Sequence, residues 1–317
     1  MSRCGIQLLL AGALLGCAGL GHAANPNYAP DVETWQEIPV PPKGKNADRV
    51  VWDYASDYSK LKWRVYLAIA TPEARLVDRA ADPIPFAAPT EGFQGGDNRF
   101  KRVDDGWLVG SDHGEFGAAL SWFGPEGDSH YLISNAHVRE FFSRQDGIYA
   151  IEGLDHMGLS CGSVIRISRQ RPSAHWHASE VLSLPQAPNT VSVRRDGSIL
   201  IVLSNSLVSI GSDHQIKTLI SDAPWESLYP NSAVLLPDES RLYIGMRQFV
   251  GEVDLTTNRL RMLVPSASYL NKLPEDMERR IRAEYPKGMS DDMRLDCEKV
   301  KAATHGAGAG QRTPPGP

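Results

Sequence analysis

Cysteine, basic residues and long hydrophobic runs are all scarce in this sequence. Its 317 residues include 4 cysteines, and Lys and Arg (33) are fewer than Asp and Glu (38). This balance argues against a protein that binds a nucleic-acid backbone through a basic surface. After Leu20 no apolar run is long enough to cross a bilayer, so we expect no transmembrane segment in the mature chain. That leaves roughly 290 residues to fold in water as one large domain or two small ones.

The one long apolar run extends from Ile6 to Leu20 and ends in the small residues Gly21-His22-Ala23. This pattern is typical of a secretory signal peptide over residues 1–23, so we expect an exported protein, periplasmic or secreted. Leu15-Gly16-Cys17 also resembles a bacterial lipobox, in which Cys17 would carry a lipid anchor. Both cleavage patterns stay open, and we favour the one after Ala23.

Two of the four cysteines lie outside this signal region, at Cys161 and Cys297. In an oxidising compartment they could form a disulfide that joins the C-terminal region to the body of the fold. The alternative is two unpaired, buried thiols.

A repeat fills the middle of the chain. Similar units begin at Asp105, Asp146, Asp196 and Asp238, at intervals of 41, 50 and 42 residues. A period of this size is typical of repeat architectures. Each unit has short runs rich in β-branched and aromatic residues between turn residues, such as "TVSVRR", "ILIVLS", "LVSIGS" and "IKTLIS" in the third unit. Four antiparallel strands in about 42 residues predict a β-propeller blade.

The repeat predicts an all-β fold with four recognisable blades over residues 98–270 and an N-terminal segment, 24–97, that completes the propeller. In that segment "WRVYLAIATPEARLVDRA" reads as two strands with a turn at Thr71-Pro72-Glu73, or as a strand that leads into a helix. The total is five or six four-stranded blades.

The C-terminal region follows a different pattern. "LPEDMERRIRAEY" places Met277, Ile281 and Tyr285 four residues apart, which predicts an amphipathic helix within a helical extension over residues 271–303. Residues 304–317 have nothing to bury, so we expect a disordered tail there.

Asparagine recurs at one position of the repeat. Asn98, Asn189 and Asn231 each lie seven residues before the aspartate that begins a unit, and in the second unit Arg139 takes this place. Seven residues are about one strand, and the first strand of a blade lines the central channel. We therefore expect these side chains at one end of the channel, although asparagine also caps turns.

Acidic and histidine side chains recur in the loops expected at that same end. Asp112, His113 and Glu115 lie between two predicted strands, and the next unit has Glu152, Asp155 and His156 in the equivalent "EGLDHMGLSCG". Asp, Asn and Gly also favour loops for backbone reasons alone. The third and fourth units place Asn205 and Arg247 in this loop. The resulting ligand-binding candidates are Asn98, Asp112, Arg139, Asp155, Asn189, Asn231 and Arg247.

The same loops contain the candidates for catalysis. His113 or His156 could act as a base, with Asp112 or Asp155 to orient it. Ser160 in "GLSCG" matches the letters of GxSxG, but it lies in a connection within a predicted β blade and not between a strand and a helix, which argues against a nucleophile elbow. Trp225 and Tyr229 lie in a link towards this face and are candidates to contact a ring. His175 and His177 flank Trp176 on one face of an outer strand, which favours a solvated surface over a second metal site.

"YPNSAVLLPDESRLYIG" and "APNTVSVRRDGSILIV" resemble the "PNG…PDG…LYV" strand pairs of the SMP-30/gluconolactonase propellers and their strictosidine-synthase-like relatives, over residues 98 to 266. By analogy we favour six blades. The resemblance implies a divalent cation held by Asn189 or Asn231, and Thr190 and Ser232 replace the family's glycine after each asparagine.

Loop carboxylates at Glu115 and Asp155 would complete such a site, with calcium if only oxygens bind and zinc if histidines converge. Two functions follow as expectations. The first is an exported propeller that binds a small-molecule ligand or a cell-envelope partner. The second is a metal-dependent lactonase or esterase-like hydrolase.

Overall fold

A computed structural model of the chain describes residues 32–40, 61–69, 71–77, 84–86, 96–172, 174–271, 273 and 275–284. The predicted signal peptide and lipobox, the C-terminal tail, Tyr285 and Cys297 lie outside these ranges. Cys161 is exposed, and its pairing with Cys297 stays a prediction. Within the described ranges, no helix has the length and apolar character needed to cross a membrane.

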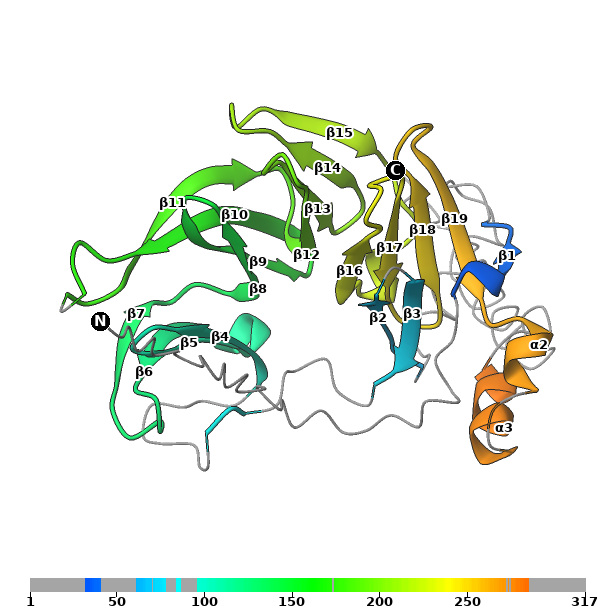
Figure 1. The fold of residues 1–317 in the computed structure, drawn as a ribbon, viewed down its shortest axis with the longest axis horizontal. Coiled ribbons are helices and arrows are strands. Elements are labelled where there is room, and N and C mark those ends of the chain that lie inside the picture. The colour runs from blue at the N-terminus through cyan, green and yellow to red at the C-terminus, as the bar shows by residue number, and fades with distance from the viewer. Residues whose placement is uncertain are drawn as a thin grey trace, which may run out of the picture.

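Three antiparallel sheets have four strands each, in sequence order from one edge to the other. Each forms one blade of the propeller (Figure 1), which confirms the predicted fold class. The first contains β4 (Asp97–Val103), β5 (Gly106–Asp112), β6 (Ala118–Phe123) and β7 (His130–Ser134). The second contains β8 (Val138–Arg144), β9 (Gly147–His156), β10 (Leu159–Ser168) and β11 (His177–Leu184). The third contains β12 (Pro188–Val193), β13 (Ile199–Leu203), β14 (Leu207–Ile210) and β15 (Ile216–Ile220).

A fourth sheet has five strands, because the N-terminal β1 (Gln36–Ile38) pairs with its outer edge strand. Its other strands are β16 (Ser232–Leu235), β17 (Arg241–Gly245), β18 (Val250–Asp254) and β19 (Arg259–Val264). The fifth sheet has two strands, β2 (Trp63–Ala68) and β3 (Thr71–Leu76). The described residues therefore form five sheets.

The predicted turn at Thr71-Pro72-Glu73 is wrong in position. These residues belong to β3, and Pro72 pairs with Leu67 of β2. The chain leaves β2 at Ile69, which has a positive φ of 59°. A β-branched residue rarely adopts this conformation, so the sequence pattern gave no sign of a turn there.

The innermost strands pack beside one another in the order β4, β8, β12, β16 and β2. Figure 1 shows the blades following one another in an arc, with β2 and β3 beside β16 and β17. The hydrophobic core lies between neighbouring sheets, and Ile199 to Leu203 of β13 are all buried because both faces of this sheet are covered.

Two helices follow the last blade, α2 (Ala267–Leu270) and α3 (Glu275–Glu284), which confirms the predicted helical extension. Ile281 is fully buried in a core cluster that also contains Trp35 and Trp63. Met277 is 39% exposed, so Ile281 contributes more to this contact than its predicted neighbour on the helix face.

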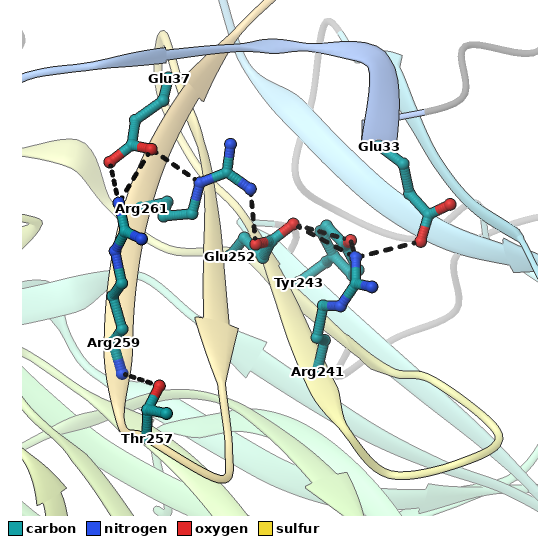
Figure 2. Close-up of polar contacts among 8 residues, drawn as sticks. All are labelled: Glu33, Glu37, Arg241, Tyr243, Glu252, Thr257, Arg259 and Arg261. Atoms are coloured by element: carbon teal, nitrogen blue, oxygen red, sulfur yellow. Dashed lines mark hydrogen bonds and ion pairs between the residues drawn. The ribbon is translucent and has the colours of Figure 1, made fainter.

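Charged residues attach β1 and the short 3-10 helix η2 (Val32–Thr34) to the fourth blade (Figure 2). Arg261 of β19 donates from Nε to Glu37 of β1 at 2.9 Å and from Nη1 to Glu252 of β18 at 2.9 Å. Glu252 is buried and also accepts from the Tyr243 hydroxyl at 2.8 Å. This network joins the N-terminal segment to a blade more than 200 residues away in sequence.

Candidate functional site

A cavity of about 690 Å³ opens at one end of the blades. Six segments contribute to its walls: the start of β4, the β5–β6 connection, Arg139 of β8, the tip of the β9–β10 hairpin, the start of β12, and the 3-10 helix η4 (Glu226–Leu228) with the residue after it. Seven of the residues singled out from the sequence line it, namely Asp112, His113, Arg139, Asp155, His156, Asn189 and Tyr229. Asp97, Met157 and Glu226 also contribute to its lining.

Two β-bulges place Arg139 and Asn189 in the cavity wall. The β8–β9 ladder pairs Val138 and Glu140 but skips Arg139, and the β12–β13 ladder pairs Pro188 and Thr190 but skips Asn189. A bulged residue leaves the regular alternation of a strand, and bulges are common beside functional sites. Arg139 thus has the same structural position in its blade as Asn189 has in the next, although the repeat pattern breaks in residue type.

Asp112 is the anchor of the Arg139 side chain. Its Oδ2 accepts from Arg139 Nη1 at 2.8 Å, its Oδ1 lies 2.9 Å from His137 Nδ1, and the Gly114 amide donates to Oδ1 at 2.9 Å. Burial by itself would raise the pKa of this carboxyl, but the His137 hydrogen bond and the Arg139 charge hold the pKa below its usual value. Asp112 is therefore an ionised acceptor whose main partners are already in place.

The second acidic and histidine set lies on a long hairpin rather than in a loop. β9 continues to His156 and β10 starts at Leu159, so Glu152 and Asp155 are strand residues and the turn is confined to Met157 and Gly158. His156 Nε2 forms an ion pair with Glu115 on the β5–β6 connection, which joins the two loop tips. The hairpin ladder pairs residues 153–155 with residues 160–162, all of which the sequence pattern placed in a loop.

Three of the predicted ligand-binding residues lie outside the cavity lining. Asn98 is buried and donates to the Gly96 carbonyl at 3.2 Å. Asn231 donates to the Trp63 carbonyl at 3.0 Å and accepts from Ser232, so it joins β16 to β2. Arg247 stacks on the Tyr229 ring at 4.1 Å and reaches the cavity only through that ring.

The metal-ligand set suggested by the family resemblance is not assembled. Asn189 and Asp155 line the cavity, whereas Asn231 binds a backbone carbonyl and a neighbouring serine, and Glu115 pairs with His156. Among the residues that the structure describes, no group of three or more His, Cys, Asp or Glu side chains is arranged to hold a metal ion. These residues do not fit the divalent cation that the resemblance implies.

The two aromatic candidates before Asn231 have different places. Trp225 is fully buried and donates from Nε1 to the Leu203 carbonyl at 3.0 Å, so it belongs to the core between the third and fourth blades. Tyr229 is 51% exposed, has a positive φ of 50° and lines the cavity. Elsewhere, His175 stacks on Tyr131 at 4.1 Å, a contact outside the cavity lining.

Sequence reasoning missed His137 and Glu140, two residues of one segment. His137 precedes β8 and contacts Asp112, and Glu140 follows Arg139 within the strand. Glu140 Oε2 accepts from Thr190 Oγ1 at 2.6 Å and from the Val191 amide at 3.0 Å, which links the inner strands of the second and third blades. Burial raises the pKa of Glu140. The sequence feature that could have identified Glu140 is a charged residue inside a predicted strand.

No protein-family model matches this chain, and no curated protein matches it. Solved structures with a similar fold include a gluconolactonase from Xanthomonas campestris, 13% identical, with a TM-score of 0.38 over 61% of this chain and 62% of that one. A virginiamycin B lyase from Staphylococcus aureus is 15% identical, with a TM-score of 0.35 over 54% and 56%. An auxiliary nutrient binding protein from Bacteroides thetaiotaomicron is 12% identical, with a TM-score of 0.35 over 50% and 38%.

This chain thus spans less than two thirds of the length of each of these proteins. The likeness is to the propeller group, at low identity, and it includes a lactonase, a lyase and a binding protein. The fold alone does not distinguish between these activities.

Proposed function

We propose that this chain is an exported propeller that binds a small polar ligand in the cavity lined by Arg139, Asp155, His156 and Asn189. One observation carries the proposal. Two adjacent blades each bulge at the equivalent position, and both bulged side chains line one cavity. The cavity volume of about 690 Å³ lies within the range of roughly 300–1,000 Å³ typical of small-molecule sites.

The arrangement favours binding over catalysis. Asp112 already accepts hydrogen bonds that fix Arg139 and the Gly114 amide, so its role is to position the pocket. His156 pairs with Glu115 and not with Asp155, which was expected to orient it. The metal-dependent hydrolase gains no support, because Asn231 and Glu115 have other partners.

A second candidate, a cell-envelope protein partner on the same face, is favoured by two exposed apolar side chains. Phe116 is 86% exposed and Met157 is 93% exposed, and they follow the two residues of the Glu115–His156 ion pair. Replacement of Phe116 by serine would weaken binding of a protein partner and leave binding of a small ligand inside the cavity largely intact, because Phe116 does not line the cavity.

A thermal-shift screen of sugars, organic acids, amines and nucleosides tests the ligand proposal. We expect at least one class to raise the melting temperature of the wild-type protein and to lose this effect with Asp155→Ala combined with Asn189→Ala, since both residues line the cavity. Lys217→Ala, an exposed change on β15, is the control and should behave as wild type. A compound that stabilises the double variant as well as the wild type would place binding elsewhere.

Export is tested separately, by cell fractionation and the intact mass of the purified protein. We expect a mature chain that begins after Ala23. A mass that fits a chain beginning with a lipid-modified Cys17 would establish the anchored form, and a full-length cytoplasmic chain would overturn export.

A further inference from the structure

We propose that the ligand of this cavity is an organic cation, such as an amine; this rests on the proposed function of the cavity. The observation behind it is the charge of the lining, which includes four carboxylates and one guanidinium. Asp97, Asp155 and Glu226 are the three carboxylates whose charges have no hydrogen-bond or ion-pair partner within the described part of the chain.

The one guanidinium in the lining already has a counter-charge. The Arg139 guanidinium pairs with Asp112 at 2.8 Å, and His156 pairs with Glu115. Arg247 lies behind the Tyr229 ring and does not line the cavity. An anionic ligand would therefore meet a guanidinium whose charge Asp112 already offsets, whereas a cation meets carboxylates that lack a counter-charge. A concave site with an excess of negative charge raises the local concentration of positively charged ligands.

The lining also indicates the kind of cation. An inorganic divalent ion needs several ligands converging on one point, and the described residues contain no such group. Tyr229 and Met157 instead offer half-exposed aromatic and exposed thioether surfaces beside the carboxylates. An ammonium group on a carbon skeleton matches this combination, with the charge near Asp155 or Glu226 and the carbon atoms against the apolar surface.

The test is titration calorimetry at low salt with three matched sets of probes. Phenethylamine and putrescine are the cations, phenylethanol and butanediol are their neutral partners, and phenylacetate and succinate are their anionic partners. We expect a cation to bind at least about tenfold more tightly than its neutral partner, with affinity that falls as salt is added. Asp155→Asn and Glu226→Gln should each weaken this binding by about two- to fivefold.

Asp128→Asn, which removes an exposed carboxylate outside the cavity lining, is the matched control and should leave affinity unchanged. Tighter binding of a neutral or anionic probe, lost with Arg139→Ala, would overturn the cation inference while the binding function stands. Failure of all probes to bind the folded wild-type protein would also overturn it. A ligand found in the wider screen would then show whether the cavity binds at all.

Discussion

Asp112 shows at the scale of a single residue how this protein forms its pocket. The carboxylate is almost fully buried, with 3% of its side chain exposed, and it is surrounded by donors from the Arg139 side chain, the His137 ring and the Gly114 amide. Its sequence position predicted a place at the end of the channel. Its partner His137 was not predicted, because the contact joins two blades and depends on how they pack.

Asp112→Asn should lower the free energy of unfolding by about 1–3 kcal/mol at neutral pH, because the new amide would face the Arg139 donor. The pKa of Asp112 is lowered in the folded protein, so its ionised form stabilises the fold above the ordinary value of 3.8. This contribution is lost as pH falls through the lower folded pKa. Urea unfolding at pH 7 and near pH 3 measures it, with Asp128→Asn as control. An equal loss at both pH values would contradict the assignment.

Glu140 should show the opposite pH dependence. Burial raises its pKa above the ordinary 4.5, so the folded protein holds this proton more tightly and the wild type loses stability as pH rises from 4.5 towards the folded pKa. Glu140→Gln keeps an oxygen to accept from Thr190 and removes the titration. We expect the variant to become more stable relative to wild type over this pH window. A constant difference from pH 4 to 8 in urea unfolding would contradict this.

At the scale of elements, the β9–β10 hairpin supports the bulge that places Asn189. Gly153 and Gly162 pair with each other in this hairpin, and Pro188 packs directly on their backbone. A Cβ atom at Gly162 would lie 2.4 Å from Pro188 Cδ and 2.5 Å from the Glu152 carbonyl oxygen. The two glycines are therefore required by close approach, and no left-handed backbone conformation is involved.

Gly162→Ala should cost about 1–3 kcal/mol of unfolding free energy, because the new methyl group must push Pro188 away. The displaced bulge should also weaken binding of any ligand found for the cavity. Gly251→Ala is the matched control, since its Cβ would meet the flexible end of Met246 at 3.2 Å in another blade. Calorimetric binding by Gly162→Ala at wild-type affinity would show that the hairpin does not position Asn189.

The attachment of β1 depends on Arg261 more than on its neighbour Arg259. Arg261 bridges Glu37 and the buried Glu252, whereas Arg259 is 65% exposed in its side chain and contacts Glu37. We expect Arg261→Ala to cost about 1–3 kcal/mol and to speed amide exchange in β1, because Glu252 loses a charged partner. Arg259→Ala should cost less than about 1 kcal/mol. Equal effects of the two changes would contradict this role of Glu252.

At the scale of the whole molecule, local sequence patterns predicted the blades but not the pairing of the N-terminal strand with the fourth blade. The repeated aspartates mark turns: Asp196 accepts from Ser198 and Asp238 from Ser240, which fixes the unit boundaries. Strands such as β13 followed from their β-branched runs. The pairing of β1 with β19 did not, because it joins residues 36–38 to 262–264 and no local pattern encodes such a contact.

The candidate site was predicted in outline. Equivalent positions in the repeat, in loops and at strand starts, identified Asp112, Arg139, Asp155 and Asn189 as candidates. All four line one cavity in the structure. Asn231, of the same repeat pattern as Asn189, lies elsewhere because its blade has no bulge at that point and its side chain binds Trp63. A bulge leaves the residue pattern of a strand almost unchanged, so the sequence could not distinguish these two asparagines.

Hydrogen–deuterium exchange of the full chain, with and without the compound that raises its melting temperature most, tests the central claim that this cavity is the binding site. Bound ligand should slow exchange in the segments that line the cavity, 96–97, 112–114, 153–158, 187–189 and 226–229, and at Arg139. Slower exchange confined to other parts of the chain, with these segments unchanged, would contradict the claim.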